Sequence, residues 1–119
     1  MKKTILVVED DGSRRKAMVD ALTGAGYDVI AGEDFAAALH MVDRLGIDVM
    51  ISDLQLSAAN PRSEALTRLA QRWAVPPKLL YVSRARVPNG QGRPRPDNIL
   101  PLPLDRAQLL DKVRLLLAS

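Results

Sequence analysis

Short apolar runs alternate along the chain with longer segments in which apolar residues recur every three or four positions. The short runs are rich in β-branched and other aliphatic residues and have the length of buried strands. They occupy residues 5–9, 28–31, 47–52, 78–83 and 98–100. The longer segments have the period of amphipathic helices. Because strands and helices alternate in this way in parallel sheets that are covered on both faces, the pattern predicts an α/β fold.

Capping residues and glycines predict where the first two helices begin and end. A first helix is expected to begin after Asp11 and to end at Gly24 and Gly26. Asp34 can cap a second helix, which Gly46 ends. The buried face of the first helix is expected to consist of Met18, Ala21, Leu22 and Ala25.

The chain departs from this alternation after a third expected helix, which covers residues 63–73. Residues 84–98 contain several prolines and glycines, which exclude a long helix, so a fourth helix is expected to be short or missing. The final helix follows Asp105, whose carboxylate, with Gln108 three residues later, resembles a capping box. Its buried face is expected to consist of Leu109, Leu110, Val113, Leu116 and Leu117.

Length and composition limit the classes of protein that the chain can form. Its 119 residues, 47% of them hydrophobic and 26% charged, are expected to fold as one domain over residues 1–119. The absence of cysteine excludes disulfides, thiol nucleophiles and zinc–thiolate sites. No apolar run reaches the roughly 18 residues that a membrane span needs. Acidic residues end the first apolar run too early for a signal peptide, so a cytoplasmic location is expected.

The basic net charge does not by itself indicate a nucleic-acid partner. The formal net charge is +3, but the 17 lysines and arginines are spread over many segments. Residues 84–98 are basic and lack the interleaved aromatics that stack on bases. We interpret them as a solvated loop, with an adaptor site for an acidic protein or a nucleic acid as the alternative. His40 lies in the second expected helix, with no cysteine or second histidine to complete a zinc site.

Acidic residues follow two of the expected strands. Glu9 and Asp10 end the first strand and Asp53 ends the third, so one edge of the sheet holds all three if these strands are neighbours. Two carboxylates about 5 Å apart repel by roughly 3 kcal/mol at an effective dielectric of about 20, so the cluster needs a proton or a cation. Mg²⁺ is suitable because it binds oxygen ligands and keeps several waters. The alternative is that these acids only cap the helices that follow.

Three motifs resemble the receiver domains of two-component response regulators, and together they extend over essentially the whole chain. ILVVEDD at residues 5–11 is similar to the first strand and acid pair of that family, and DVMISDLQL at 48–56 is similar to its phosphoacceptor strand. Residues 102–105 and the helix after them resemble the family's last motif. The resemblance implies a flavodoxin-like, doubly wound five-stranded parallel sheet in the order 2-1-3-4-5.

The resemblance also implies roles for individual residues. Asp53 would accept a phosphoryl group from a sensor histidine kinase or a phosphotransfer protein, and Ser83 would be the switch hydroxyl that turns toward it. Asp10, Asp53 and the backbone carbonyl of Gln55 would hold Mg²⁺, with Glu9 acting through water. Such a protein is not a turnover enzyme, although it can catalyse its own phosphorylation and dephosphorylation. A downstream protein partner or effector domain is implied, and a homodimer is compatible with it.

Several positions depart from the family pattern. Leu102 stands where the family usually has a lysine that contacts the acyl phosphate, and Ile99 stands where many members have a switching Tyr or Phe. Ser57 replaces a common proline, and Arg84 replaces a small residue. Because a guanidinium is always charged and grips phosphate with two nitrogens, Arg84 or Arg86 is a candidate to replace the absent lysine.

Two other functions compete with a phosphorylated receiver. A degenerate receiver would keep the fold and act as a phosphorylation-independent protein-interaction module, which Leu102, Ile99 and the expected lack of a fourth helix favour. A small phosphatase or nucleotide-binding enzyme on a related fold is the third reading. It is disfavoured because Asp53-Leu54-Gln55 lacks a second aspartate and no glycine-rich phosphate loop follows Val8.

Overall fold

The computed structural model describes residues 2–34, 36–37, 46–53, 77–83 and 99–119, and for Asp53 and Ser83 it describes the backbone alone. The predicted third helix at 63–73, the irregular segment at 84–98 and most of the second helix lie outside these residues. No helix in the described ranges is both long enough and apolar enough to cross a membrane.

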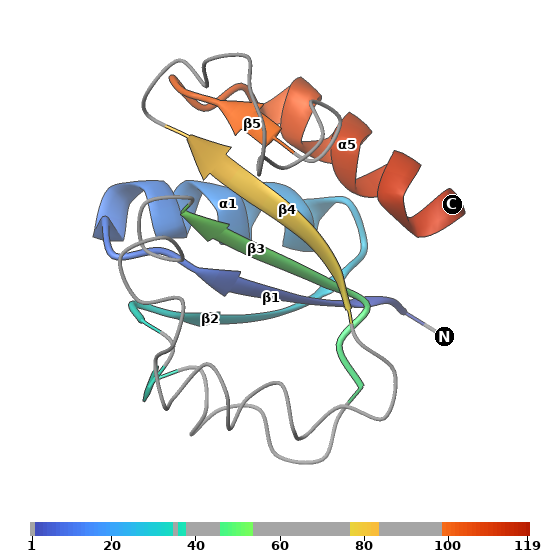
Figure 1. Ribbon diagram of the computed structural model, residues 1–119, viewed down its shortest axis with the longest axis horizontal. Helices are drawn as coiled ribbons and strands as arrows, with labels where there is room; N and C mark the ends of the chain where they lie inside the picture. The colour runs from blue at the N-terminus through green and yellow to red at the C-terminus, as the bar shows by residue number, and fades with distance from the viewer. Residues whose placement is uncertain (1, 35, 38–45, 54–76, 84–98) are drawn as a thin grey trace, which may run out of the picture.

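Five parallel strands form a single sheet (Figure 1). They are β1 (Thr4–Val8), β2 (Asp28–Gly32), β3 (Val49–Asp53), β4 (Lys78–Ser83) and β5 (Ile99–Pro101). Their order is β2-β1-β3-β4-β5, which confirms the predicted flavodoxin-like topology. The predicted strands match the observed strands to within two residues at each end. Each strand is a short apolar run because the sheet is buried on both faces, as is usual for parallel sheets.

Two helices are described in full, and both begin at a predicted capping residue. In α1 (Gly12–Gly24), Asp11 Oδ1 accepts a hydrogen bond from the Arg14 backbone N–H at 2.9 Å. In α5 (Arg106–Ala118), Asp105 Oδ1 accepts from the Gln108 N–H at 3.1 Å. The cap predicted at Asp34 is also present, because its Oδ1 accepts from the N–H of Ala37, at 2.7 Å.

The main core lies between one face of the sheet and the pair α1 and α5. Alternate residues of the strands point to this face, and the helices cover them with the residues of their buried stripes. The core residues are Ile5, Val7, Met18, Ala21, Leu22, Val49, Ile51, Leu80, Val82, Leu100, Leu109, Val113 and Leu116. Leu110 and Leu117 are only partly buried. The prediction for Ala25 was wrong: it is exposed because it is the C-cap, beyond the last turn of α1.

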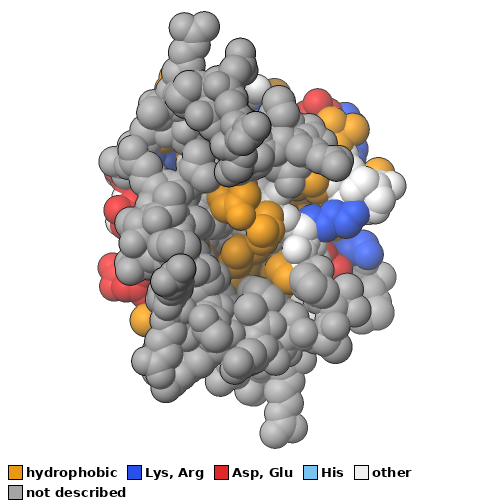
Figure 2. Space-filling view, viewed as in Figure 1, with side chains coloured by type: hydrophobic (Ala, Val, Ile, Leu, Met, Phe, Trp, Pro, Cys, Tyr) orange, Lys and Arg blue, Asp and Glu red, His pale blue; other side chains and the backbone are white. Residues whose placement is uncertain are grey.

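The opposite face of the sheet is apolar as well. Leu6, Val8 and Met50 point away from α1 and α5 and are 0%, 1% and 5% exposed. Figure 2 shows hydrophobic side chains in the middle of this view, surrounded by residues that are not described. Burial on both faces leaves the two edges formed by the strand ends as the places where charged groups can gather.

One acidic residue stabilises the edge at which the strands begin. Asp48 Oδ2 accepts a hydrogen bond from the Thr4 N–H at 2.8 Å, and the Asp48 N–H donates to the Thr4 carbonyl at 2.9 Å. The Asp48 carbonyl accepts from the Lys78 N–H at 3.0 Å. Asp48 therefore connects the starts of β1, β3 and β4.

Candidate functional site

The strand register brings three of the predicted site residues to one edge of the sheet. Val8 lies opposite Ser52, and Asp53 lies opposite Val82. Glu9, which follows Val8, and Asp53 therefore leave the sheet from adjacent strands, and Ser83 ends the next strand. Neighbouring strands are about 4.8 Å apart, so residues at the ends of adjacent strands are close enough for side chains of ordinary length to meet.

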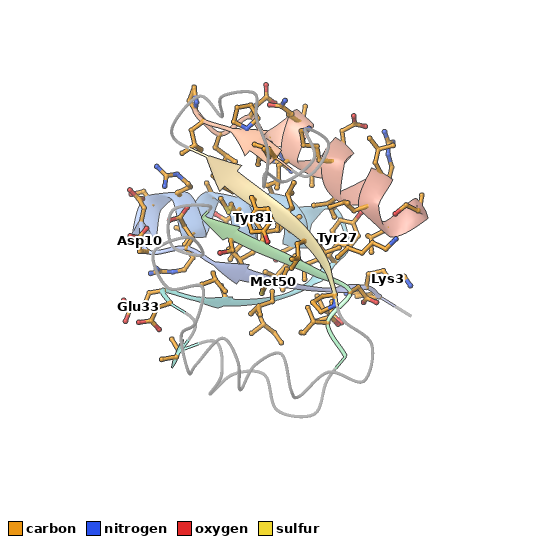
Figure 3. The ribbon with its side chains drawn as sticks, viewed as in Figure 1. Lys3, Asp10, Tyr27, Glu33, Met50 and Tyr81 are labelled. Carbon is orange, nitrogen blue, oxygen red and sulfur yellow. The ribbon has the colours of Figure 1, made fainter. Side chains whose placement is uncertain are left out.

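Exposed acids extend this edge. Figure 3 shows Asp10 and Glu33 beyond the ends of β1 and β2, at the edge opposite Lys3. Both residues are exposed, whereas Glu9 is 1% exposed. The Asp10 carboxyl interacts with that of Glu9 and raises its pKa. The edge at which the strands end is therefore acidic from β2 to β1, and β3 contributes Asp53.

Glu9 is a buried carboxylate whose two oxygens both accept hydrogen bonds. Its Oε2 accepts from the Asp11 N–H at 3.1 Å, and its Oε1 accepts from Arg14 Nη1, also at 3.1 Å. Burial raises the pKa of Glu9 above its ordinary value of 4.5, and the interaction with Asp10 raises it further. The Asp11 N–H and the Arg14 guanidinium oppose this increase in pKa. Burial and Asp10 thus favour the protonated form of Glu9, whereas the Asp11 N–H and Arg14 favour its ionised form.

Two arginines in the first turn of α1 contact Glu9, and sequence reasoning missed both. Arg14 pairs with the Glu9 carboxylate, while Arg15 Nη1 donates to the Glu9 backbone carbonyl at 2.9 Å. A positive charge at a helix N-terminus is unfavourable because the helix dipole is positive there. Two arginines in the first turn of a helix, four residues after an acid pair, were the signal in the sequence that these side chains turn back toward the acids.

The remaining predicted residues fall into two groups. Leu102 is partly buried and packs against the main core, so its side chain places an alkyl group where the family usually has a cation. Ile99 begins β5 and pairs with Tyr81, and Ser83 pairs with Pro101. Other positions lie outside the described residues, namely His40, Gln55, Ser57, Arg84 and Arg86.

The donor atoms at this edge fit Mg²⁺. Carboxylate oxygens are the hard ligands that this ion prefers, and a cation stabilises a carboxyl pair such as Glu9 and Asp10 in its charged form. Among the described side chains, no three His, Cys, Asp or Glu residues gather as a metal site. Glu9 and Asp10 are among these side chains, and the carboxylate of Asp53 is not.

The chain belongs to the response regulator receiver domain family. The family model described as "Response regulator receiver domain" matches residues 5–91, which span β1 to β4 and include the acidic edge. The chain is therefore a receiver domain of two-component signalling. Receiver domains generally use Mg²⁺ and interact with histidine kinases and effectors.

Solved structures extend the likeness through β5 and α5. The chain is similar to chemotaxis response regulator CheY4 of Vibrio cholerae, with a TM-score of 0.71 and 21% identity over 98% of this chain and 99% of that one. A response regulator from Thermotoga maritima gives 0.71 and 18%, with both chains fully covered. A signal receiver domain of a two-component histidine kinase from Clostridium thermocellum gives 0.68 and 18%, again with full coverage of both. No curated protein sequence matches the chain.

Proposed function

We propose that the chain accepts a phosphoryl group on Asp53 from a sensor histidine kinase or a phosphotransfer protein. The observation that carries this proposal is the parallel register, which aligns Val8 with Ser52 and so brings Glu9, Asp10 and Asp53 to one edge. An Asp53 oxygen would form a bond to phosphorus while the bond from phosphorus to the donor's histidine nitrogen breaks. For this transfer the protein mainly has to position the reacting groups and neutralise their negative charge.

Each residue at the edge has a defined part in this proposal. Asp10, Asp53 and the Gln55 carbonyl would hold Mg²⁺, and Glu9 would accept a hydrogen bond from a metal-bound water. When bound, the ion offsets the negative charge of the acids and of the phosphoryl oxygens. Ser83 would donate its hydroxyl to a phosphoryl oxygen and so report the modified state. Hydrolysis of the acyl phosphate would reset the protein, which is a signalling switch and not a turnover enzyme.

A second candidate function is supported by Leu102. Leu102 packs against the core. Because its side chain is an alkyl group, it supplies no positive charge to a phosphoryl group. A receiver that binds its partners without phosphorylation would need no such charge. In that case the protein would be a constitutive interaction module on the same fold.

Titration with Mg²⁺ and then with beryllofluoride, a phosphoryl mimic, distinguishes the two functions. In the wild type we expect the backbone amide signals at the ends of β1 and β4 to shift when Mg²⁺ and then beryllofluoride are added. In Asp53→Asn the shift on addition of beryllofluoride should be absent. Asp28→Asn is the matched control, because Asp28 is an exposed acid at the start of β2, on the opposite edge. Its response should equal that of the wild type. If the wild type responds to Mg²⁺ but not to beryllofluoride, the phosphoacceptor function is excluded and the interaction module remains.

A further inference from the structure

The Arg14–Glu9 ion pair is more deeply buried than the other ion pairs described in α1. The Arg14 side chain is 20% exposed and that of Glu9 is 1% exposed, with 3.1 Å between Nη1 and Oε1. Lys16 and Asp20, further along α1, form a pair at 2.8 Å whose side chains are 77% and 62% exposed. Water and salt screen the second pair far more strongly than the first, so only the first pair is expected to hold its partners in place.

The Arg14 guanidinium occupies one of the two Glu9 oxygens that could accept from a metal-bound water. Glu9 Oε2 accepts the Asp11 N–H, and Oε1 accepts from Arg14 Nη1. A metal-bound water that donates to Oε1 would compete with Arg14 for the same lone pairs. The divalent ion would also repel a guanidinium held against this carboxylate.

The position of Arg14 in the first turn of α1 indicates that Glu9, and not the helix, holds its side chain in place. The first turn of a helix disfavours a cation, so the helix itself provides no reason for Arg14 to stay at this end. Its contact with Glu9 compensates for that cost. Arg15, the next residue, donates to the Glu9 backbone carbonyl and not to its carboxylate.

We propose that Arg14 is a built-in counter-cation of the acid pair, which competes with Mg²⁺ for Glu9 and thereby lowers the metal affinity of the receiver. The inference rests on the proposed function for the position of the metal. In the metal-free protein Arg14 neutralises Glu9, and metal binding displaces the guanidinium from Oε1. A purely structural role for Arg14 would leave the metal affinity unchanged.

The test compares Mg²⁺ dissociation constants, measured by NMR titration, for the wild type and Arg14→Gln. We expect the variant to bind Mg²⁺ roughly three- to tenfold more tightly, as the loss of a partly buried competing ion pair predicts. Lys16→Gln is the matched control, since it removes the same charge from the next turn of α1. An equal gain in both variants would mean a general charge effect and would overturn the proposal. An unchanged or weaker affinity in Arg14→Gln, or no Mg²⁺ binding by either protein, would also overturn it.

A second measurement needs no variant to fold. In wild-type protein with ¹⁵N-labelled arginine, the Arg14 side-chain Nε–H signal should shift as Mg²⁺ is added, while the Arg114 signal from α5 stays in place. An Arg14 signal that does not respond during metal saturation would contradict displacement. Beryllofluoride is absent from both experiments, so a failure of Asp53 to accept the mimic would leave this inference standing. Conversely, normal uptake of the mimic with equal Mg²⁺ affinities would reject the inference alone.

Discussion

Glu9 and Asp48 are acidic residues that flank strands at opposite edges of the same sheet. Asp48 is part-buried and accepts a backbone N–H from Thr4, so it completes the hydrogen bonding where the strands begin. Glu9 is buried where β1 ends, and it draws the first turn of α1 toward itself through Asp11 and Arg14. The two acids have different partners because of the direction of the strands. In a parallel sheet a helix begins after each strand ends, so the first turn of the helix meets acids at that edge and not at the edge where the strands begin.

Tyr81 provides a pH-dependent test at the scale of one residue. Burial raises the pKa of its phenol above 10.0, so the folded state favours the protonated form. This contribution to stability is fully present below about pH 10 and is lost as the pH rises through the raised pKa. Relative to Tyr81→Phe, the wild type should therefore lose stability above pH 10, as measured by urea unfolding at several pH values.

Spectrophotometric titration checks the same prediction directly. The chain has two tyrosines, so the difference between the wild-type and Tyr81→Phe titrations isolates Tyr81. Its midpoint should lie above 10.0. Tyr27→Phe retains Tyr81 and must keep this high-pH transition. A midpoint at or below the ordinary value would show that Tyr81 is not desolvated.

At the scale of an element, the end of α1 shows how one glycine terminates a helix. The Gly26 N–H donates to the Thr23 carbonyl at 3.0 Å, and the Tyr27 N–H donates to the Leu22 carbonyl at 3.1 Å. This pair of bonds is a Schellman motif, which requires a left-handed residue at its centre. Gly26 has a φ of 97° and supplies that conformation. Tyr27 then packs against the core, which directs the chain into β2.

Gly26→Ala should lower the free energy of unfolding by about 1–2 kcal/mol, because a Cβ disfavours the left-handed region. Among the described residues other than its two neighbours in the chain, none has an atom within 4 Å of the position that this Cβ would take, so the cost is one of backbone conformation. Gly12→Ala is the control: Gly12 lies in the first turn of α1, and its Cβ would meet the end of the Arg15 side chain at 3.6 Å, an ordinary contact distance. We expect it to be neutral or slightly stabilising. Equal urea midpoints for the two variants would contradict the assignment of the motif.

At the scale of the whole molecule, one core joins the sheet to α1 and α5. Residues from all of β1, β3, β4 and β5 contribute to it, together with the buried stripes of both helices. Leu109 and Leu115 belong to the same helix and carry the same side chain, but they are 0% and 60% exposed. Replacing each of them by alanine therefore isolates the contribution of tertiary packing to stability, because the residue type and the helix are the same.

Leu109→Ala should destabilise the fold by about 2–5 kcal/mol, since it removes buried methyl groups and leaves a cavity. Leu115→Ala should change the stability by no more than about 0.5 kcal/mol, because its side chain is already largely in water and alanine favours a helix. Urea unfolding of both variants, followed by circular dichroism, gives the comparison. Similar losses in the two variants would mean that α5 is not held by the core described above.

The sequence by itself determined the features that depend on neighbouring residues. The order of strands and helices follows from the local period of apolar residues, and the caps at Asp11, Asp34 and Asp105 follow from a side chain that reaches an N–H three residues away. The placement of acids after β1 and β3 is also local. The strand order came from motifs that resemble a family, because apolar periodicity does not say which strands are neighbours.

Only the tertiary structure decided what surrounds these residues. The pairing of β1 with β3 set the acids of two distant segments on one edge, and the return of α1 over the sheet buried Glu9 against Arg14. The exposure of Ala25 and the packing of Leu102 depend in the same way on where elements end and what they meet. These outcomes require contacts between residues far apart in the chain, and burial and charge pairing exist only once those contacts have formed.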